Sequence, residues 1–461
     1  MPASDILSER DAAHLLRRAG FGASASDLVA FTGLSRAEAV DALLAVKPSA
    51  ARGPGKNTFD QKSLERLQVW WLRRMLSPRY RLQEKMTLFW HDHFPSGVAV
   101  IDRQDALAEQ NAMFRSYGLG GFRELLHRVT RDRAMLQYLD GVRSRRGEVN
   151  ENYARELMEL FTLGPLDEDG QPNYEQPDVV ALARALTGFT WAFGTARPQV
   201  YLAPNRFDDL EKILFAGKPF QMLGVLGVEN PDGTQFPPET NVIDGLFAHR
   251  DTRGRPTLAR FLVRKLWAWF ATPDAGGALV DELSASFVAN GYMIGELLRA
   301  LLTHDAFYSE AARSSTPKTP VEFATQALRG LGARSTLKEL PALLSRMGME
   351  LFNPPGVEGW QHGAAWLATS RYLARMELAQ AIASARPKSG FRFKRKLPEG
   401  ATADTLVDAA LVELGLEVSL ETRQSLIDHL AGGEFGSEAW FEMKYRGLFM
   451  LLLSLPEFQV H

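Results

Sequence analysis

Two histidines close an apolar helical segment near residue 90. His91 and His93 are separated by one residue in Lys85-Met-Thr-Leu-Phe-Trp-His-Asp-His-Phe94, directly before Pro95. A continuing helix would point these side chains in nearly opposite directions, whereas an extended terminus would place both on one side. Because imidazole is a common ligand of divalent cations, the extended form would let both rings reach one metal ion. Alternatively, one ring caps the helix and the other packs among aromatic neighbours.

Carboxylates gather on one face of a second predicted helix, residues 150–163. At 100° per residue, Asn152, Glu156 and Glu159 fall within an arc of about 60°, and Arg155 lies beside them. Two carboxylates and an amide on one arc suit a hard cation, or an acid–base pair whose charges separate the two pKa values. The alternative is a solvated face on which Arg155 pairs with Glu159.

A loop at residues 353–366 combines glycine and proline with Trp360, His362 and Trp366. Rigid loops with aromatic side chains often bind ligands. The alternative is a buried loop that anchors neighbouring helices through Trp360. His362 alone does not decide between these interpretations.

A basic stretch from Arg386 to Lys396 contains interleaved Phe391 and Phe393 and no acid. Such a stretch is able to bind phosphate or nucleic acid. The whole chain, however, has a formal net charge of -2 and none of the common nucleic-acid-binding motifs. We therefore expect a solvated surface loop, and we do not expect a nucleic-acid partner.

Composition excludes several classes of site. The 461 residues include no cysteine, so disulfides, thiolate nucleophiles, iron–sulfur clusters and thiolate-bound zinc are all ruled out. The sequence also lacks the GxxxxGK[ST], HExxH and GxSxG motifs. Any metal ligand must therefore come from His, Asp, Glu or Asn.

Helical periodicity dominates the elements that must position these residues. We predict an all-α fold, a multi-helix array or bundle with a small insertion that contains a β-hairpin. The predicted divisions are an N-terminal helical region with the His and Glu motifs at 1–192, an irregular insertion at 193–240, a second helical region at 241–385 and a C-terminal helical lobe at 401–461. Gln199-Val-Tyr-Leu202 and Lys212-Ile-Leu-Phe215 are the predicted strands of the insertion.

Neither a leader nor a membrane span is expected. The first ten residues form no apolar run of signal-peptide length, which predicts a cytoplasmic protein as the sequence stands, or an exported one if a leader has been removed. The longest apolar run, at residues 448–455, is far shorter than the roughly 20 residues that a spanning helix needs.

The motifs described above resemble those of a known family. The chain is similar nearly end to end to the bacterial family catalogued as domain of unknown function 1800. The resemblance is carried by His14-Leu-Leu-Arg-Arg-Ala-Gly-Phe-Gly22, Lys85 to Phe94, Gln137-Tyr-Leu-Asp140, Asn150 to Gly164, Ala183-Arg-Ala-Leu-Thr-Gly188, Pro354-Pro-Gly-Val-Glu-Gly-Trp360 and Leu455-Pro-Glu-Phe458.

The resemblance implies a mainly helical fold and supplies no reaction. Members of the family often carry export signals and are encoded beside sulfatase-like proteins. The family pattern usually has a His-Asp pair near Phe207-Asp208, followed by an acidic/Lys pair resembling Glu211-Lys212. Here Phe207 stands where that histidine falls, which departs from the pattern and weakens a metal interpretation.

Our leading hypothesis is an enzyme of unknown reaction with a helix-borne His/Glu site. In it, His91, His93, Glu156, Glu159 and Asp208 ligate a divalent metal ion, the candidate cofactor. Catalysis is assigned to His91, Glu156, Glu159 and Arg155, the last of which holds an anionic group of the substrate. The alternative is a helical scaffold that binds and stabilises a partner protein, with a sulfatase-like neighbour as the candidate.

Overall fold

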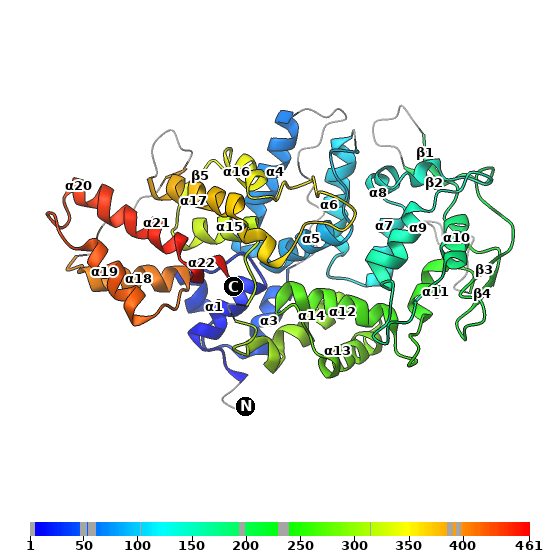
Figure 1. Ribbon diagram of the computed structural model, residues 1–461, viewed down its shortest axis with the longest axis horizontal. Helices are drawn as coiled ribbons and strands as arrows, with labels where there is room; N and C mark the ends of the chain where they lie inside the picture. The colour runs from blue at the N-terminus through cyan, green and yellow to red at the C-terminus, as the bar shows by residue number, and fades with distance from the viewer. Residues whose placement is uncertain are drawn as a thin grey trace.

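The fold is built almost entirely from helices, as the periodicity predicts. The computed structural model describes residues 5–46, 53, 61–101, 103–192, 199–228, 239–313, 315–384, 391–392, 397 and 399–461. Figure 1 shows an elongated molecule with helix α5 near its centre, the C-terminal helices α18–α21 at one end and the short strands β1–β4 at the other. The basic stretch 386–396 lies outside the described residues, except for Phe391 and Arg392.

The chain up to residue 248 contains eleven α-helices among the described residues. They are α1 (Glu9–Arg18), α2 (Ala25–Phe31), α3 (Arg36–Leu44), α4 (Gln61–Met75), α5 (Arg81–His93), α6 (Gln104–Tyr117), α7 (Phe122–Thr130), α8 (Arg133–Tyr138), α9 (Asn152–Glu156), α10 (Gln176–Ala185) and α11 (Val242–Ala248). Helix α9 continues directly into a π-helix, Leu157–Thr162. The predicted helix at 150–163 is therefore present, but its second half is wider than an α-helix.

The rest of the chain is helical as well. Its helices are α12 (Thr257–Phe270), α13 (Gly277–Ala289), α14 (Ile294–Thr303), α15 (Pro320–Gly330), α16 (Leu340–Arg346), α17 (Thr369–Ser384), α18 (Ala403–Leu414), α19 (Leu420–Leu430), α20 (Glu438–Trp440), α21 (Arg446–Ser454) and α22 (Pro456–Gln459). A second π-helix, Phe441–Tyr445, joins α20 to α21. No helix of the described residues is long and apolar enough to cross a bilayer.

Short strands form three antiparallel pairs in the part of the chain that the structure describes. Strand β1 (Phe189–Trp191) pairs with β2 (Val200–Leu202), β3 (Lys212–Leu214) with β4 (Met222–Gly224), and β5 (Arg334–Ser335) with β6 (Phe391–Arg392). The predicted hairpin-containing insertion is confirmed. Its two expected strands do not pair with each other, however, because β2 returns to β1 and β3 turns back to β4.

Helix α5 is the central element of the fold. All thirteen of its residues are buried, which is the pattern of a helix surrounded by protein on every side. Its apolar side chains enter both hydrophobic clusters of the molecule: Met86 and Trp90 belong to one, and Leu88 belongs to the other. The polar residues of α5 therefore need partners from neighbouring elements, and these partners define the site.

Candidate functional site

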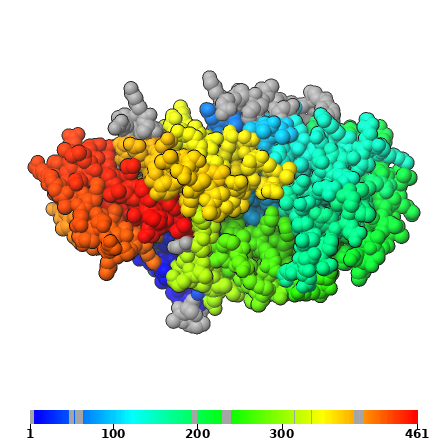
Figure 2. All heavy atoms as spheres, viewed as in Figure 1, coloured from blue at the N-terminus to red at the C-terminus, as the bar shows by residue number. Residues whose placement is uncertain are grey.

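A cleft of about 380 Å³ opens beside the C-terminal end of α5. Helix α12, the loop 353–368 and the N-terminus of α15 form its walls. Its lining residues are Arg18, Phe89, Asp92, His93, Arg264, Lys265, Ala268, Trp269, Pro273, Thr316, Pro317, Thr319, Glu322, Glu358, His362, Gly363, Trp366 and His461. In the space-filling view, the yellow segment that includes this loop meets the green segment of α12–α14 near the middle of the molecule (Figure 2). Aromatic and proline side chains thus enclose a set of ionisable groups.

Asp92 and His362 form the central pair of the cleft. His362 Nε2 lies 2.8 Å from Asp92 Oδ2, and the backbone N–H of Trp360 donates to Asp92 Oδ1 at 2.7 Å. Asp92 is buried, whereas the His362 side chain is 51% exposed. The carboxylate therefore fixes one ring nitrogen and leaves the other free, since Nδ1 makes no hydrogen bond with the described residues.

The backbone around Gly359 allows this pair to form. Gly359 has a φ of +80°, and a Cβ there would lie 2.4 Å from Asp92 Oδ1 and 2.5 Å from the Asp92 carbonyl oxygen. Glycine is the residue that adopts such a φ without strain and that leaves room for this approach. The glycine-rich loop after Asn353 is thus shaped to carry Trp360 and His362 onto the end of α5.

His91 and His93 point to different neighbours. Helix α5 stays helical through His93, so the extended terminus that would bring the two rings together does not form. His91 Nε2 accepts the backbone N–H of Phe352 at 3.2 Å, and its ring packs against Trp71 and Trp360. Burial lowers the pKa of His91 to about 4. His91 is thus a neutral ring within an aromatic cluster, outside the cleft lining.

His93 and Lys265 both contact the end of the π-helix. His93 Nε2 donates to the carbonyl of Phe161 at 3.1 Å, and Lys265 Nζ donates to the carbonyl of Leu160 at 3.3 Å. Carbonyls at a helix end lack intrahelical partners and attract cationic groups. Burial lowers the pKa of Lys265, while the charges of Asp92 and Glu358 oppose that change. The helical segment that carries Glu156 and Glu159, α9 with the π-helix that follows it, is therefore joined to the cleft through its backbone carbonyls.

Glu322 lies at the other end of the cleft. It is the third residue of α15, where its carboxylate accepts the backbone N–H of Thr319 at 2.7 Å in a capping box. The same carboxylate is ion-paired with Lys85 and lies 3.0 Å from His461 Nε2. Although burial opposes ionisation, the charge of Lys85 and the hydrogen bonds from Lys85 and His461 hold the pKa of Glu322 well below its ordinary value. This carboxylate is ionised at neutral pH.

Trp269 lies between the end of the cleft that holds Asp92 and His362 and the end that holds Glu322. Its ring centroid is 5.7 Å from that of His362, and Lys85 Nζ lies 5.6 Å from its centroid. Partial burial opposes the charged form of His362, but the hydrogen bond to Asp92 and the Asp92 charge raise the pKa of His362 above its ordinary value. The Glu322 charge acts in the same direction. The two ends therefore influence each other electrostatically across one aromatic ring.

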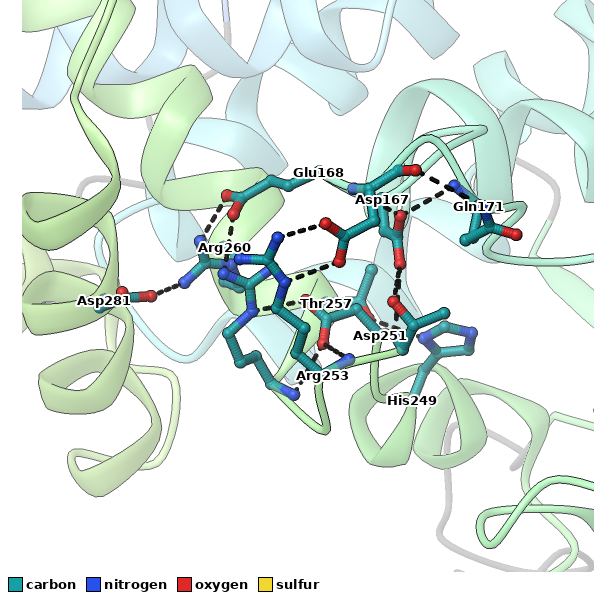
Figure 3. Close-up of polar contacts among 12 residues, drawn as sticks. Asp167, Glu168, Gln171, His249, Asp251, Arg253, Thr257, Arg260 and Asp281 are labelled. Carbon is teal, nitrogen blue, oxygen red and sulfur yellow. Dashed lines mark hydrogen bonds and ion pairs between the residues drawn. The ribbon is translucent and has the colours of Figure 1, made fainter.

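Ion pairs fix the outer face of α12 beside the cleft. Glu168 contacts Arg255, Arg260 and Arg264, and Arg260 also contacts Asp281. Figure 3 shows Glu168 facing Arg260 across this network. Of these arginines, Arg264 also lines the cleft. The turn that follows the π-helix thus holds α12, and with it Lys265 and Trp269, in place.

Glu156, Glu159 and Arg155 lie near the cleft without lining it. Arg155 pairs with Glu151 at 3.0 Å and donates to Gln176, so the considered Arg155–Glu159 pair does not form. Tyr174 donates to Glu159 at 3.4 Å. Burial, then the charges of Glu159 and Glu358, raise the pKa of Glu156. The charge of Glu358, on the loop 353–368, thus acts on Glu156.

Asp208 belongs to a separate network. Arg184 donates to both of its carboxylate oxygens, at 2.7 and 3.1 Å, and Lys212 donates to its backbone carbonyl. Lys212 Nζ also lies 5.0 Å from the centroid of Phe207, the residue at the position of the family histidine. The charged partners of Asp208 are therefore Arg184 and Lys212. Asp208 does not join Glu156 and Glu159 in a set of metal ligands.

The described residues contain no group of three or more His, Asp or Glu side chains that could hold a metal ion. In particular, His91 and His93 diverge, and Asp208 is ion-paired elsewhere. The donor set proposed for a divalent cation is therefore not assembled in this arrangement.

The motifs that carry the family resemblance meet at this cleft. Lys85 to Phe94 supplies Asp92 and His93 to the lining, and Pro354 to Trp360 supplies Glu358 and leads to His362. The π-helix of Asn150 to Gly164 contacts His93 from outside the lining. The sequence profile of the family described as "Protein of unknown function (DUF1800)" matches residues 14–460. The chain belongs to the DUF1800 family. Comparison with curated proteins found no match, and comparison with solved structures found none either.

Sequence analysis of this DUF1800 protein missed most of the cleft. Asp92 was passed over between two histidines, and Lys265, Glu322 and His461 were not singled out. His362 was noted only within its loop. The one usable signal was the pairing of a polar helix end with a Gly/Pro-punctuated loop that carries a histidine. No spacing rule relates residues 270 positions apart.

Proposed function

We propose that this DUF1800 protein is an enzyme in which His362, held by Asp92, transfers protons in the central cleft. The observation that carries the proposal is the 2.8 Å hydrogen bond between His362 Nε2 and Asp92 Oδ2 at the wall of the cleft. A carboxylate bonded to one ring nitrogen fixes the tautomer, so that Nε2 carries the proton and Nδ1 offers a lone pair. This retains the enzyme hypothesis and moves its centre from Glu156 and Glu159 to the cleft.

The surroundings of His362 favour hydrolysis. No described hydroxyl group is hydrogen-bonded to its ring, and the chain has no cysteine, so the proton that Nδ1 removes belongs to water or to the substrate. Lys265 lies close enough for its charge to act on Asp92 and His362. In the proposed reaction, Nδ1 takes a proton from water as the water oxygen attacks the central carbon, sulfur or phosphorus atom of an ester. The bond from that atom to the alcohol oxygen then breaks, and the imidazolium returns the proton to the leaving alcohol oxygen. The Lys265 ammonium stabilises the oxyanion that develops.

A substrate panel with paired variants tests this function. Carboxylic, sulfate and phosphate esters of p-nitrophenol would be incubated with wild type, His362→Gln and Asp92→Asn. General-base catalysis contributes about 100- to 10,000-fold, so His362→Gln should lose at least 100-fold in kcat/KM. His429→Gln is the matched control, because His429 contacts the Lys444 carbonyl in the C-terminal helices, away from the cleft.

Two outcomes would contradict the proposal. One is undiminished hydrolysis in His362→Gln, and the other is a wild-type protein that hydrolyses none of the esters. Metal binding at the Glu156/Glu159 set and binding of a partner protein both stay predictions. Elemental analysis of wild type beside Glu156→Ala tests the first, and co-purification of a partner tests the second.

A further inference from the structure

Two buried indole N–H groups of the cleft walls lack an acceptor. Nε1 of Trp269 and Nε1 of Trp366 are each inaccessible to solvent and make no hydrogen bond with the described residues. Both residues line the cleft. Indole nitrogen can only donate and neither group has an acceptor, so a side-chain rotation that exposed them to the cleft would let them donate to a ligand.

Arg18 adds a third source of donors. Its Nε donates to the carbonyl of Phe270 at 2.5 Å, and its Nη2 donates to those of Ala271 and Trp269 at 2.6 and 3.3 Å. The guanidinium thereby caps the last turn of α12 and is held beside Trp269. Its Nη1 makes no hydrogen bond with the described residues. Arg18 is 1% exposed and lines the cleft, so a fixed, charged donor is left over.

The two buried carboxylates of the cleft are already in use, whereas the exposed Glu358 makes no hydrogen bond with the described residues. Glu322 accepts the Thr319 N–H and is paired with Lys85, and Asp92 accepts the Trp360 N–H and contacts His362. Neither carboxylate is within hydrogen-bonding distance of Arg18 or of the two unpaired indoles. The unmet requirement of the walls is therefore for acceptor oxygens.

Positive charge accumulates at the same end. Arg18 lines this end of the cleft, and three further basic residues, Lys85, Lys318 and Arg375, are buried and interact with the charge of Glu322. Of these four basic residues, Lys85 forms an ion pair within the described residues, with Glu322, whereas Lys318 donates to the Phe458 and Val460 carbonyls and Arg375 donates to the Lys318 carbonyl and to Gln459. Glu322 is a single carboxylate beside these basic residues, and a bound anion would add a second negative charge near them.

We infer that this end of the cleft binds an oxyanion, a carboxylate, sulfate or phosphate group of the ligand, between Arg18 and the indole N–H groups of Trp269 and Trp366. The anion supplies several acceptor oxygens and a further negative charge together. The inference deepens the proposed function, on which it rests for the assignment of that anion to the substrate. A substrate that spans the cleft would then present its reacting bond to His362, 5.7 Å from the Trp269 ring.

Indole NMR of the wild-type protein tests the inference without risk of misfolding. The nine tryptophans give nine indole N–H resonances, and Trp269→Phe and Trp366→Phe identify two of them. Sulfate, phosphate and acetate would each be titrated at constant ionic strength against chloride. At least one of these anions should shift the Trp269 and Trp366 resonances saturably. Trp71 and Trp440, which already donate to Glu84 and the Leu430 carbonyl, should not move.

Affinity measurements on variants make the test sharper. A hydrogen bond to a charged group is worth about a tenfold change in affinity or more, so Trp366→Phe and Arg18→Lys should each weaken binding of the same anion at least about tenfold. Wild-type affinity in Trp366→Phe, or no saturable shift with any of the three anions, would overturn the inference. If Arg18→Lys does not fold, the NMR titration and Trp366→Phe decide the matter.

His362→Gln separates this inference from the proposed function. The variant keeps every group of the anion site, so it should bind the anion as wild type does while losing ester hydrolysis. Anion binding with hydrolysis that survives in His362→Gln would overturn the proposed function alone. Hydrolysis that depends on His362 without any anion binding would overturn the oxyanion site alone.

Discussion

Helix α5 carries two buried carboxylates, Glu84 and Asp92, that have opposite surroundings. Glu84 is fully buried and accepts four hydrogen bonds, from Trp71 at 2.9 Å, from Arg74 at 2.6 Å, and from Arg115 at 2.7 and 2.9 Å. Asp92, eight residues and about 12 Å along the helix, accepts one backbone N–H and contacts a histidine that is half exposed in a cleft.

The difference distinguishes a carboxylate that stabilises the fold, Glu84, from one that is a candidate for catalysis, Asp92, on the same helix. The oxygens of Glu84 are filled by fixed cations and an indole, an arrangement in which every partner is protein and no space remains for a ligand. Asp92 instead holds a ring whose second nitrogen is free at a cavity. A buried carboxylate is thus a candidate for catalysis when its network ends at a cavity, and a stabilising element when its network is closed.

The largest expected effect breaks the closed network. Glu84→Ala would leave the Arg115 guanidinium buried without its carboxylate partner, which costs about 3–5 kcal/mol. The free energy of unfolding, measured by denaturant titration, should fall by that amount. Asn111→Ala serves as a control, because it removes one amide oxygen that accepts from the same Arg115 and leaves the carboxylate in place. A loss below about 1 kcal/mol would mean that the network is not stabilising as described.

The next effect comes from closing the space at Asp92. Gly359→Ala places a methyl group where the Asp92 oxygens lie and demands a strained φ of +80°. Such strain costs about 1–3 kcal/mol, and it should also displace Trp360 and His362. We expect lower thermal stability together with lower esterase activity. Gly147→Ala is a matched control, since it has the same φ with nothing within 4 Å of its Cβ. Unchanged activity in Gly359→Ala would show that the loop does not position His362.

Asp92→Asn sharpens the electrostatic half of the comparison. The Asp92 partner raises the pKa of His362, so the ion pair contributes stability fully below the unfolded pKa of about 6.5 and loses it as pH rises through the folded pKa. Because His362 is half exposed, we expect at most about 1 kcal/mol, seen below pH 6 and shrinking towards pH 8. The pH at which esterase activity rises should fall in the variant. The same apparent pKa in both proteins would contradict the pairing.

The smallest expected effect is at Glu156. Burial and the charges of Glu159 and Glu358 raise its pKa, so its ionised form is unfavourable in the folded protein. Glu156→Gln removes that charge and should leave stability unchanged or raise it by a few tenths of a kcal/mol, with the gain growing above pH 5. Thermal melts across pH check this sign. A folded variant that loses activity would instead restore the Glu156/Glu159 site as the catalytic centre.

Much of the fold follows from sequence. The helix expected at 150–163 begins as α9 at Asn152–Glu156, and the strand expected at Gln199–Leu202 is β2 at Val200–Leu202. These succeed because apolar periodicity and caps act over a few residues. The π-helix at Leu157–Thr162 was not foreseen, since it has the apolar spacing of an α-helix and differs only in its hydrogen bonds.

The features of the candidate site also divide into those that follow from the sequence and those that follow from the tertiary structure. The sequence by itself determined the helices, the family and the polar nature of the α5 terminus, because these depend on side chains close together in the chain. Only the tertiary structure decided that Asp92, not His91, meets His362 across 270 positions, and that Glu322 joins Lys85 and His461. Packing makes that choice, since the full burial of α5 assigns each consecutive residue of its last turn to a different neighbouring segment.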